Sequence, residues 1–107
     1  MKNIVLRLYV TGTTPRSKKG IANLKAICEG ELEKKVDLQI IDVLEQPQLA
    51  DDEKIIATPT LIKEIPPPIR RIIGDLSDRE KVLLGLEIVE AIESEKTEEL
   101  LHDGEAQ

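Results

Sequence analysis

Two short apolar runs on either side of a long stretch with helical periodicity constrain the fold of this chain most. Residues 3–10 are mainly apolar with Arg7 as the one charge, and residues 36–43 carry apolar side chains on both faces. Between them, apolar residues recur at steps of three and four, at Ile21, Leu24, Cys28 and Leu32. The pattern predicts a strand, a helix of about 20 residues and a second strand, a βαβ unit whose strands are parallel neighbours. Because residues 36–43 are apolar on both faces, we expect them to form a central strand.

The start of the predicted helix is marked by capping residues. Gly12 breaks the first strand, the Thr14 hydroxyl can accept an amide N–H of the first turn, and Pro15 suits the first helical position. Cys28 lies within the apolar stripe of this helix, so we expect its thiol to fill space in the core.

The second half of the chain predicts a short helix, a hairpin and a last helix. A helix is expected over residues 47–52, and residues 60–65 and 69–73 are predicted strands joined by three prolines, which favours an antiparallel hairpin. Ser77 and Glu80 have the spacing of a capping box for the helix that follows. The predicted order, β-α-β-α-β-β-α, is the layout of the thioredoxin-like α/β fold.

Residues 82–89 fit two structures. As a helix they place apolar side chains on two sides and Gly85 in the interior, at a cost of about 1 kcal/mol relative to Ala. As a strand they show a period of two, with apolar residues at Val82, Leu84, Leu86 and Ile88. The capping box favours the helix and Gly85 weakens it. Either the segment is an ordinary C-terminal helix buried on two sides, or the local conflict marks a segment with two accessible states.

Composition restricts the core and the classes of partner. The chain has 14 Ile, 14 Leu and 6 Val but a single aromatic residue, Tyr9, so the core must be aliphatic. Binding of single-stranded nucleic acid by stacking bases on aromatic side chains is therefore disfavoured. The net charge of -6 argues against binding to a nucleic-acid backbone. The charge is uneven, with +3 over residues 1–43 and -9 over residues 44–107. We expect one domain over residues 1–93 and an acidic, disordered tail over residues 94–107.

The sequence does not indicate catalytic or metal sites. In thioredoxin-like enzymes a Cys-x-x-Cys pair stands at the start of the first helix, but residues 11–17 contain no cysteine, which disfavours a thiol oxidoreductase. The one histidine, His102, falls in the polar tail, and no His and Cys residues have metal-ligand spacing. We therefore expect no enzymatic activity, no cofactor and no metal. Pro59, which precedes the third strand, is a candidate for a structural cis-proline.

The chain shows no targeting or membrane signal. Its start is strand-like rather than a signal peptide, and no apolar run approaches the roughly 20 residues needed to span a bilayer. Cys28 is the single cysteine and cannot form an intramolecular disulfide. We expect a cytoplasmic protein.

Basic residues are the remaining candidates for a site. The first turn of the long helix holds three cations that oppose the helix dipole, with no nearby acid evident in the sequence: Arg16, Lys18 and Lys19. Lys54, Arg70 and Arg71 come near Thr58-Pro59 and the hairpin. Either these residues form an ordinary solvated surface, or they form a contact face for an acidic protein partner, which an exposed strand edge would serve as well.

Several long runs of this sequence match one known protein family. The matching runs are residues 40–50, residues 52–61 and above all residues 70–83, which read Arg-Arg-Ile-Ile-Gly-Asp-Leu-Ser-Asp-Arg-Glu-Lys-Val-Leu. Together with Leu-Tyr-Val-Thr-Gly at residues 8–12 and Thr14-Pro15, the likeness covers about residues 4–90. Because the likeness extends over long runs in order and spacing rather than over one short motif, we conclude that the chain resembles the KaiB family of circadian clock proteins.

This resemblance implies a non-enzymatic protein that binds the KaiC ATPase, in a circadian clock or in a KaiC-linked stress response. It also implies competition with a clock histidine kinase, a homo-oligomer (dimer or tetramer), and a second fold in which the C-terminal half is rearranged. The positions that match partner-facing residues of the family are Lys19, Lys54, Arg70 and Arg71. Those that match residues biasing the change of fold are Gly85, Glu87 and Glu90. The alternatives are a thioredoxin-like adaptor for another partner and a thiol oxidoreductase.

Overall fold

The computed structural model describes residues 3–88 of the chain. Its elements are β1 (Ile4–Val10), α1 (Pro15–Ile27), the 3-10 helix η1 (Gly30–Lys34), β2 (Val36–Asp42), α2 (Pro47–Asp52), β3 (Thr60–Ile65), β4 (Arg70–Ile73) and α3 (Arg79–Gly85). Apart from η1, this is the predicted β-α-β-α-β-β-α order. The expected tail over residues 94–107, His102 and Glu90 lie outside the described residues.

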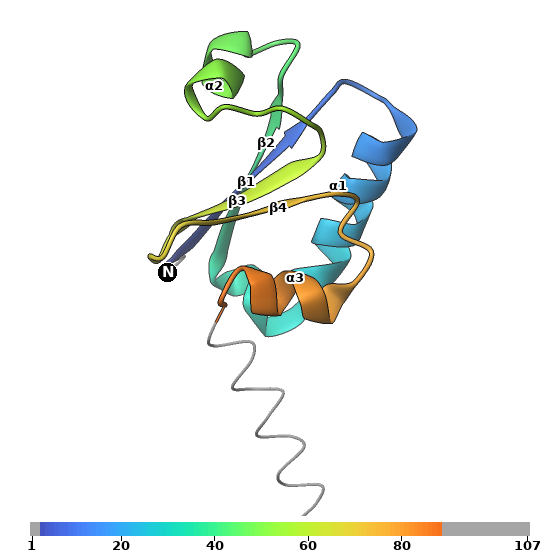
Figure 1. Cartoon of the computed structure of the whole chain (residues 1–107). Coiled ribbons are helices and arrows are strands. Elements are labelled where there is room, and N and C mark those ends of the chain that lie inside the picture. Colours follow the sequence, from blue (N-terminus) through green and yellow to red (C-terminus); the bar gives the residue numbers. More distant parts are fainter. Residues whose placement is uncertain (1–2, 89–107) are drawn as a thin grey trace, which may run out of the picture.

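The four strands form one mixed sheet in the order β2-β1-β3-β4 (Figure 1). β1 is parallel to β2, and β3 is antiparallel to both β1 and β4. The βαβ unit and the hairpin are therefore confirmed. The expectation that β2 is central is wrong, because β2 lies at an edge of the described sheet and Ile40 is 41% exposed. Apolar side chains on both faces of a strand indicate that other elements pack on both faces. They do not indicate a central position, because both faces of an edge strand can also be packed.

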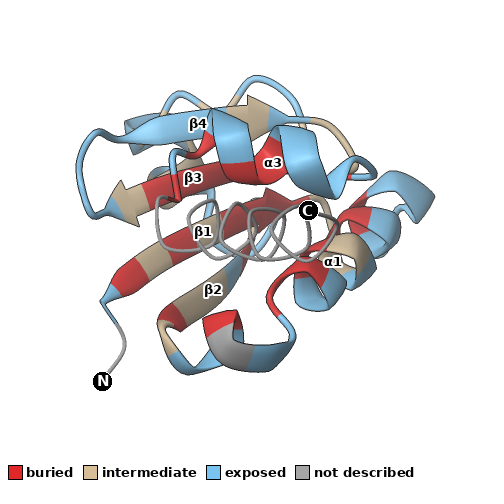
Figure 2. Ribbon diagram, turned by 90° about the horizontal axis from the view of Figure 1, so that it is seen from below, coloured by how far each residue is buried: buried red, intermediate tan, exposed pale blue. Residues whose placement is uncertain are grey.

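The sheet separates two apolar clusters. The larger cluster joins inward-facing residues of β1 and β3 to α1 and α3, and Leu6, Leu24 and Leu83 are among its members. Figure 2 shows buried segments on each of these four elements. The smaller cluster lies on the other face, where Tyr9, Ile41 and Ile62 pack against Leu49 of α2 and its neighbours. α1 and α3 thus cover one face, and the short α2 covers part of the other. As expected, Cys28 belongs to the larger cluster and is buried.

α1 begins as predicted and ends earlier. The Thr14 hydroxyl accepts a hydrogen bond from the Ser17 amide, and Pro15 occupies the first turn. The predicted single helix of about 20 residues is wrong, because α1 ends at Ile27 and η1 follows from Gly30. Gly30 has a φ of +85°, a left-handed conformation that glycine adopts without strain and that interrupts the helix. Leu32 is nevertheless buried, because η1 turns it back into the larger cluster.

The last described element is a helix, α3, and its cap differs from the expectation. Asp78 rather than Ser77 is the N-terminal cap, since an Asp78 carboxylate oxygen accepts the Lys81 amide at 3.1 Å. The Ser77 amide instead donates to the Asp75 carboxylate, which draws Ser77 into the preceding turn. Val82 and Leu83 are buried against the sheet, whereas Leu84 is exposed, so only one side of α3 is covered.

Candidate partner-binding site

The predicted basic residues lie on and around β4, an edge strand of the described sheet. Across the hairpin, Arg70 is opposite Lys63 and Arg71 is opposite Ile62. Because consecutive strand residues point to opposite faces, Arg70 lies on the face covered by α1 and α3, and Arg71 lies on the face of α2. The two arginines therefore stand on either side of the sheet edge rather than in one flat patch.

Each of these arginines is paired with an acid of the same chain. Arg70 Nε lies 2.7 Å from Glu87 Oε2. Arg71 Nη2 donates to the Glu53 carbonyl at 2.9 Å and lies 3.8 Å from the Glu53 carboxylate. The side chains of Arg70 and Arg71 remain 51% and 41% exposed, and ion pairs in such positions contribute about 0–1 kcal/mol. An acidic group from another molecule can replace either internal partner at small cost.

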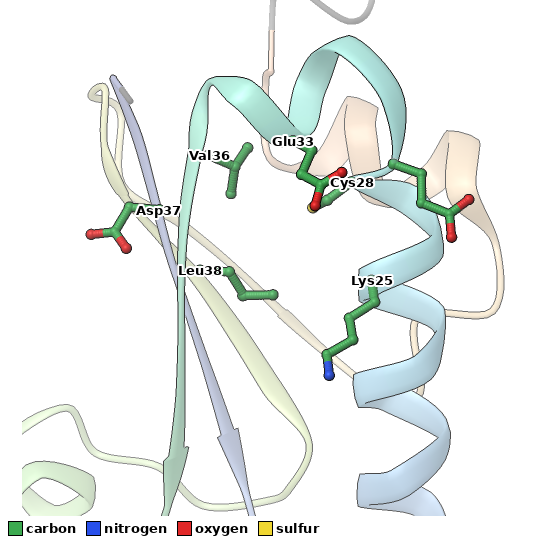
Figure 3. A pocket seen from close by; sticks show the side chains of 7 residues that line it. Lys25, Cys28, Glu33, Val36, Asp37 and Leu38 are labelled. Carbon is green, nitrogen blue, oxygen red and sulfur yellow. The ribbon is translucent and has the colours of Figure 1, made fainter. Parts of the chain in front are cut away.

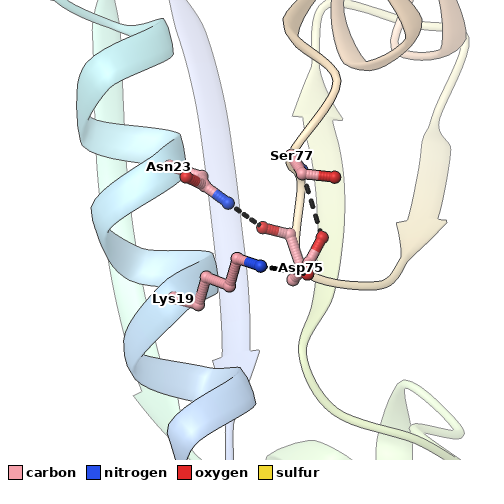
Figure 4. A network of polar contacts seen from close by, with 4 residues as sticks. All are labelled: Lys19, Asn23, Asp75 and Ser77. Atoms are coloured by element: carbon pink, nitrogen blue, oxygen red, sulfur yellow. Dashed lines mark hydrogen bonds and ion pairs between the residues drawn. The ribbon is translucent and has the colours of Figure 1, made fainter.

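Lys19 also has an internal partner, which the sequence did not reveal. Its ammonium lies 3.4 Å from the Asp75 carboxylate, in the segment that follows β4 (Figure 4). Asn23, one turn further along α1, donates to the Asp75 carbonyl at 2.6 Å. Hydrogen bonding from Ser77, and then the Lys19 ammonium, hold the pKa of Asp75 below its usual value. These contacts tie the end of β4 to α1.

Lys54 differs from the other three predicted cations. It is exposed, follows Glu53 directly, and has a φ of +54°. Over residues 3–88, no hydrogen bond or ion pair joins its ammonium to another group. Lys54 is therefore the predicted partner-facing cation whose charge has no counterpart within the described part of the chain.

Two of the predicted switch residues lie at the end of α3. Gly85 is the last residue of the helix, and Glu87 has a φ of +54° in the turn that follows. The sequence analysis missed Lys63, which is 0% exposed and donates from Nζ to the Glu87 carbonyl at 3.3 Å. Burial lowers the pKa of Lys63, and the Glu87 carboxylate opposes that effect. Its alternation with the inward-facing Leu61 was the signal that could have placed it inside.

The position of a thioredoxin-type redox pair is occupied by hydroxyl groups. The Thr11 and Thr58 hydroxyls lie 2.6 Å apart, and the buried Ser17 hydroxyl accepts the Thr11 amide at 3.0 Å. The Thr58–Pro59 peptide bond is cis, and a Cβ on Gly20 of α1 would lie 2.9 Å from the Pro59 ring. Cys28 lies at the other end of α1, where burial raises the pKa of its thiol to about 11. This thiol is therefore a poor nucleophile near neutral pH.

A surface hollow of about 430 Å³ lies beside Cys28, between α1, η1 and β2 (Figure 3). Lys25 and Glu33 stand at its walls, and Val36 and Leu38 contribute apolar surface. Over residues 3–88, the structure contains no group of at least three His, Cys, Asp or Glu side chains that could hold a metal ion. In the same range, no helix has the length and apolar character needed to cross a bilayer.

Comparison with known sequences identifies one family. The KaiB domain matches residues 7–88 of this chain. The circadian clock protein KaiB3 of a Synechocystis strain is 61% identical over 89 residues, which cover 83% of this chain and 87% of KaiB3. The circadian clock oscillator protein KaiB of a Picosynechococcus strain is 54% identical over 99 residues, covering 92% and 95% of the two chains.

Comparison with solved structures confirms the thioredoxin-like fold. The N-terminal domain of SasA from Synechococcus elongatus has a TM-score of 0.63 and 30% identity, and the match covers 78% of this chain and 81% of that domain. Mitochondrial thioredoxin 3 from Saccharomyces cerevisiae has a TM-score of 0.65 at 17% identity, covering 81% and 79% of the chains. At that level of identity, the likeness to thioredoxin concerns the fold alone.

Proposed function

The chain belongs to the KaiB family of circadian clock proteins, and from this we propose that it is a non-enzymatic clock component that binds a KaiC-type ATPase. The observation that carries the proposal is the family match over residues 7–88, which includes β4, α3 and the whole basic set. The process it serves is a circadian clock or a KaiC-linked stress response.

In this proposal the basic residues around β4 bind the ATPase. Lys19, Lys54, Arg70 and Arg71 are exposed. Arg70 and Arg71 lie on β4, Lys19 contacts Asp75 just after β4, and Lys54 follows Glu53, which contacts Arg71. Three of them hold weak internal ion pairs that acidic groups of a partner can replace. Complementary charge of this kind mainly speeds association and selects the partner. We further propose that the protein competes with a clock histidine kinase for the ATPase, as the resemblance to the KaiB family implies.

We also propose that the C-terminal half has a second fold, in which the protein forms a dimer or tetramer. Gly85, Glu87 and Glu90 bias the choice between the two folds. The position of Gly85 at the end of a helix of seven residues supports this role, because so short a helix depends on packing rather than on its own propensity. Glu87 connects the same turn to Arg70, so the switch residues and the binding residues share contacts.

The test is a pull-down of the full chain with the KaiC-type ATPase of the same organism, once with ATP and once with ADP. We expect retention in at least one nucleotide state. Loss of binding in both states would contradict the proposal and favour an adaptor for a different partner. The variant Cys28→Ser serves as a control, since the proposed contact does not involve the thiol.

A further inference from the structure

The outer edge of β4 presents main-chain groups that are free to pair. The Gly74 amide donates to the Pro59 carbonyl at 3.0 Å, so Gly74 points inward to β3. In an antiparallel ladder inward and outward residues alternate, which directs the amide and carbonyl groups of Ile73 and Arg71 outward. Over residues 3–88, no backbone hydrogen bond reaches these outward groups. The edge is therefore a template for one more strand.

The side chains along this edge specify what a paired strand must carry. Arg70 and Arg71 are consecutive, and they lie on opposite faces with half-exposed charges. In an added strand, neighbouring residues also alternate between the two faces. Two consecutive acidic residues would therefore place one carboxylate beside each arginine. Ile73 lies on the same face as Arg71 and is 53% exposed, so it would contact an apolar residue two positions from the acid that faces Arg71.

We propose that β4 binds an extended segment of an acidic protein partner by strand addition, and that this segment contains two adjacent acidic residues with an apolar residue two positions away. The inference rests on the proposed function in that it names the type of segment that the basic face recognises. In the free protein, Glu87 and Glu53 form ion pairs with the two arginines, and the acidic residues of the partner replace them when its strand pairs with β4.

A second copy of this chain would leave the charges of the edge unmatched. If two β4 strands paired antiparallel about Ile72, Arg71 of one would lie opposite Ile73 of the other, and no acidic residue would face either arginine. Positive charge on an edge strand is a common protection against such self-pairing. The same charges select an acidic strand, so the observations favour a partner of opposite charge.

The first experiment uses a blocked peptide, acetyl-Ile-Thr-Glu-Glu-Thr-Ile-amide, which reads the same in both directions and so fits parallel or antiparallel pairing. Its isomer acetyl-Ile-Glu-Thr-Glu-Thr-Ile-amide has the same charge, but both acids lie on one face. We expect the first peptide to bind the full chain about threefold to fivefold more tightly in an amide NMR titration, with shifts at residues 70–74. Equal affinity for both peptides would overturn the proposal.

The second experiment removes the outward amide. Ile73→Pro deletes that donor without touching the inward hydrogen bonds of β4, whereas Ile73→Thr keeps the donor and controls for the lost apolar surface. We expect Ile73→Pro to weaken binding of the first peptide at least about fivefold relative to Ile73→Thr. Equal binding by the two variants, with the hairpin amide shifts retained, would overturn the proposal.

The same pair of variants is then tested against the KaiC-type ATPase. We expect Ile73→Pro to bind the ATPase more weakly than Ile73→Thr, because both variants lose the apolar contact and only Ile73→Pro also loses the outward amide. If the wild-type chain binds the ATPase and Ile73→Pro binds equally well, strand addition at β4 is wrong and the proposed function stands. If the wild-type chain does not bind the ATPase, the proposed function fails, and the peptide titration still decides whether β4 accepts an acidic strand.

Discussion

Lys63 and Cys28 show how burial sets the chemistry of single side chains in this protein. Both side chains are buried on the face of the sheet that α1 and α3 cover. Burial disfavours the charged form of each group, which lowers the pKa of the Lys63 ammonium and raises that of the Cys28 thiol. Each shift makes stability depend on pH in a direction that can be measured.

Replacing Lys63 by Met removes the charge and keeps most of the side-chain length. Because burial lowers the pKa of Lys63 below 10.5, the folded protein disfavours the ammonium form. We expect Lys63→Met to be at least as stable as the wild type at pH 7, and Lys63→Ala to lose about 2 kcal/mol through the cavity it leaves. The unfolded chain holds this proton to higher pH, so the wild type gains stability as pH rises through the lowered pKa toward 10.5, and the gap to Lys63→Met narrows.

Urea unfolding followed by circular dichroism at pH 7 and pH 10 measures these differences. A Lys63→Met variant that is clearly less stable than the wild type at pH 7 would show that the bond to the Glu87 carbonyl outweighs the cost of burying the charge.

Cys28 is expected to be protected in the folded protein. With a pKa of about 11, compared with 9.0 for an exposed thiol, the thiolate fraction at pH 8 is about 100-fold lower than in the unfolded chain. Ellman's reagent should therefore react at least about 100-fold faster in urea than in buffer at the same pH. The raised pKa stabilises the fold fully below pH 9, and this contribution is lost as pH rises through about 11. Rapid reaction without urea would contradict the buried position.

α3 illustrates how one short element depends on its ends and its single covered side. It has seven residues, its cap is Asp78, and it buries Val82 and Leu83 against the sheet. A helix of this length is not stable alone in water, so capping and packing determine whether it forms.

The cap can be tested by comparing two neighbouring residues. Asp78→Ala removes the side chain that accepts the Lys81 amide and should cost about 1 kcal/mol of unfolding free energy. Ser77→Ala keeps the amide that donates to Asp75 and removes only the hydroxyl that bonds to the same carboxylate, so it should change stability by less than about 0.5 kcal/mol. Urea unfolding of both variants checks the assignment, and a larger loss for Ser77→Ala would restore the capping box that the spacing suggests.

Gly85 must be tested together with Ile72. Ala has a helix propensity about 1 kcal/mol better than Gly, but a Cβ at position 85 would lie 3.0 Å from Ile72 Cδ1. We expect Gly85→Ala alone to stabilise the described fold by much less than 1 kcal/mol. In an Ile72→Val background, which removes Cδ1, the same change should recover most of that gain. A double-mutant cycle by urea unfolding measures the coupling between the two substitutions, with the amide shifts of residues 79–85 as the structural readout. Additive effects on the unfolding free energy would show that the Ile72 side chain moves aside without cost.

At the scale of the whole molecule, the proposed binding surface around β4 carries the exposed positive charges of Arg70 and Arg71. Reversal of both arginines, Arg70→Glu with Arg71→Glu, should weaken binding to the KaiC-type ATPase at least about tenfold at low salt, and the loss should shrink as salt screens exposed charges. Lys25→Glu is the control, since it changes an exposed cation on α1 whose ammonium has no hydrogen bond or ion pair within residues 3–88. Unaltered affinity in the arginine variant would remove β4 from the binding surface.

Much of the architecture could be predicted because it depends on local patterns. Thr14 and Pro15 mark the start of α1, and three prolines separate the two strands of the hairpin. Both signals could be recognised because they involve only a few neighbouring residues. The cap of α3 was misassigned because Ser77 and Asp78 are both suitable caps, and the choice depends on a bond to Asp75. The position of β2 at an edge depends on which strand β3 pairs with, and that contact is distant in sequence.

The sequence by itself determined the order of elements, the aliphatic core and the family, because periodicity, capping and long matching runs are properties of the chain alone. Only the tertiary structure decided that Arg70 and Arg71 stand on opposite sides of an edge, that Asp75, Glu53 and Glu87 neutralise three of the four predicted cations, and that Lys63 is buried. Charges act through space, and the partners of these cations lie 17 to 56 positions away or on another element. The spacing of residues along the chain therefore could not predict which acid lies beside which cation.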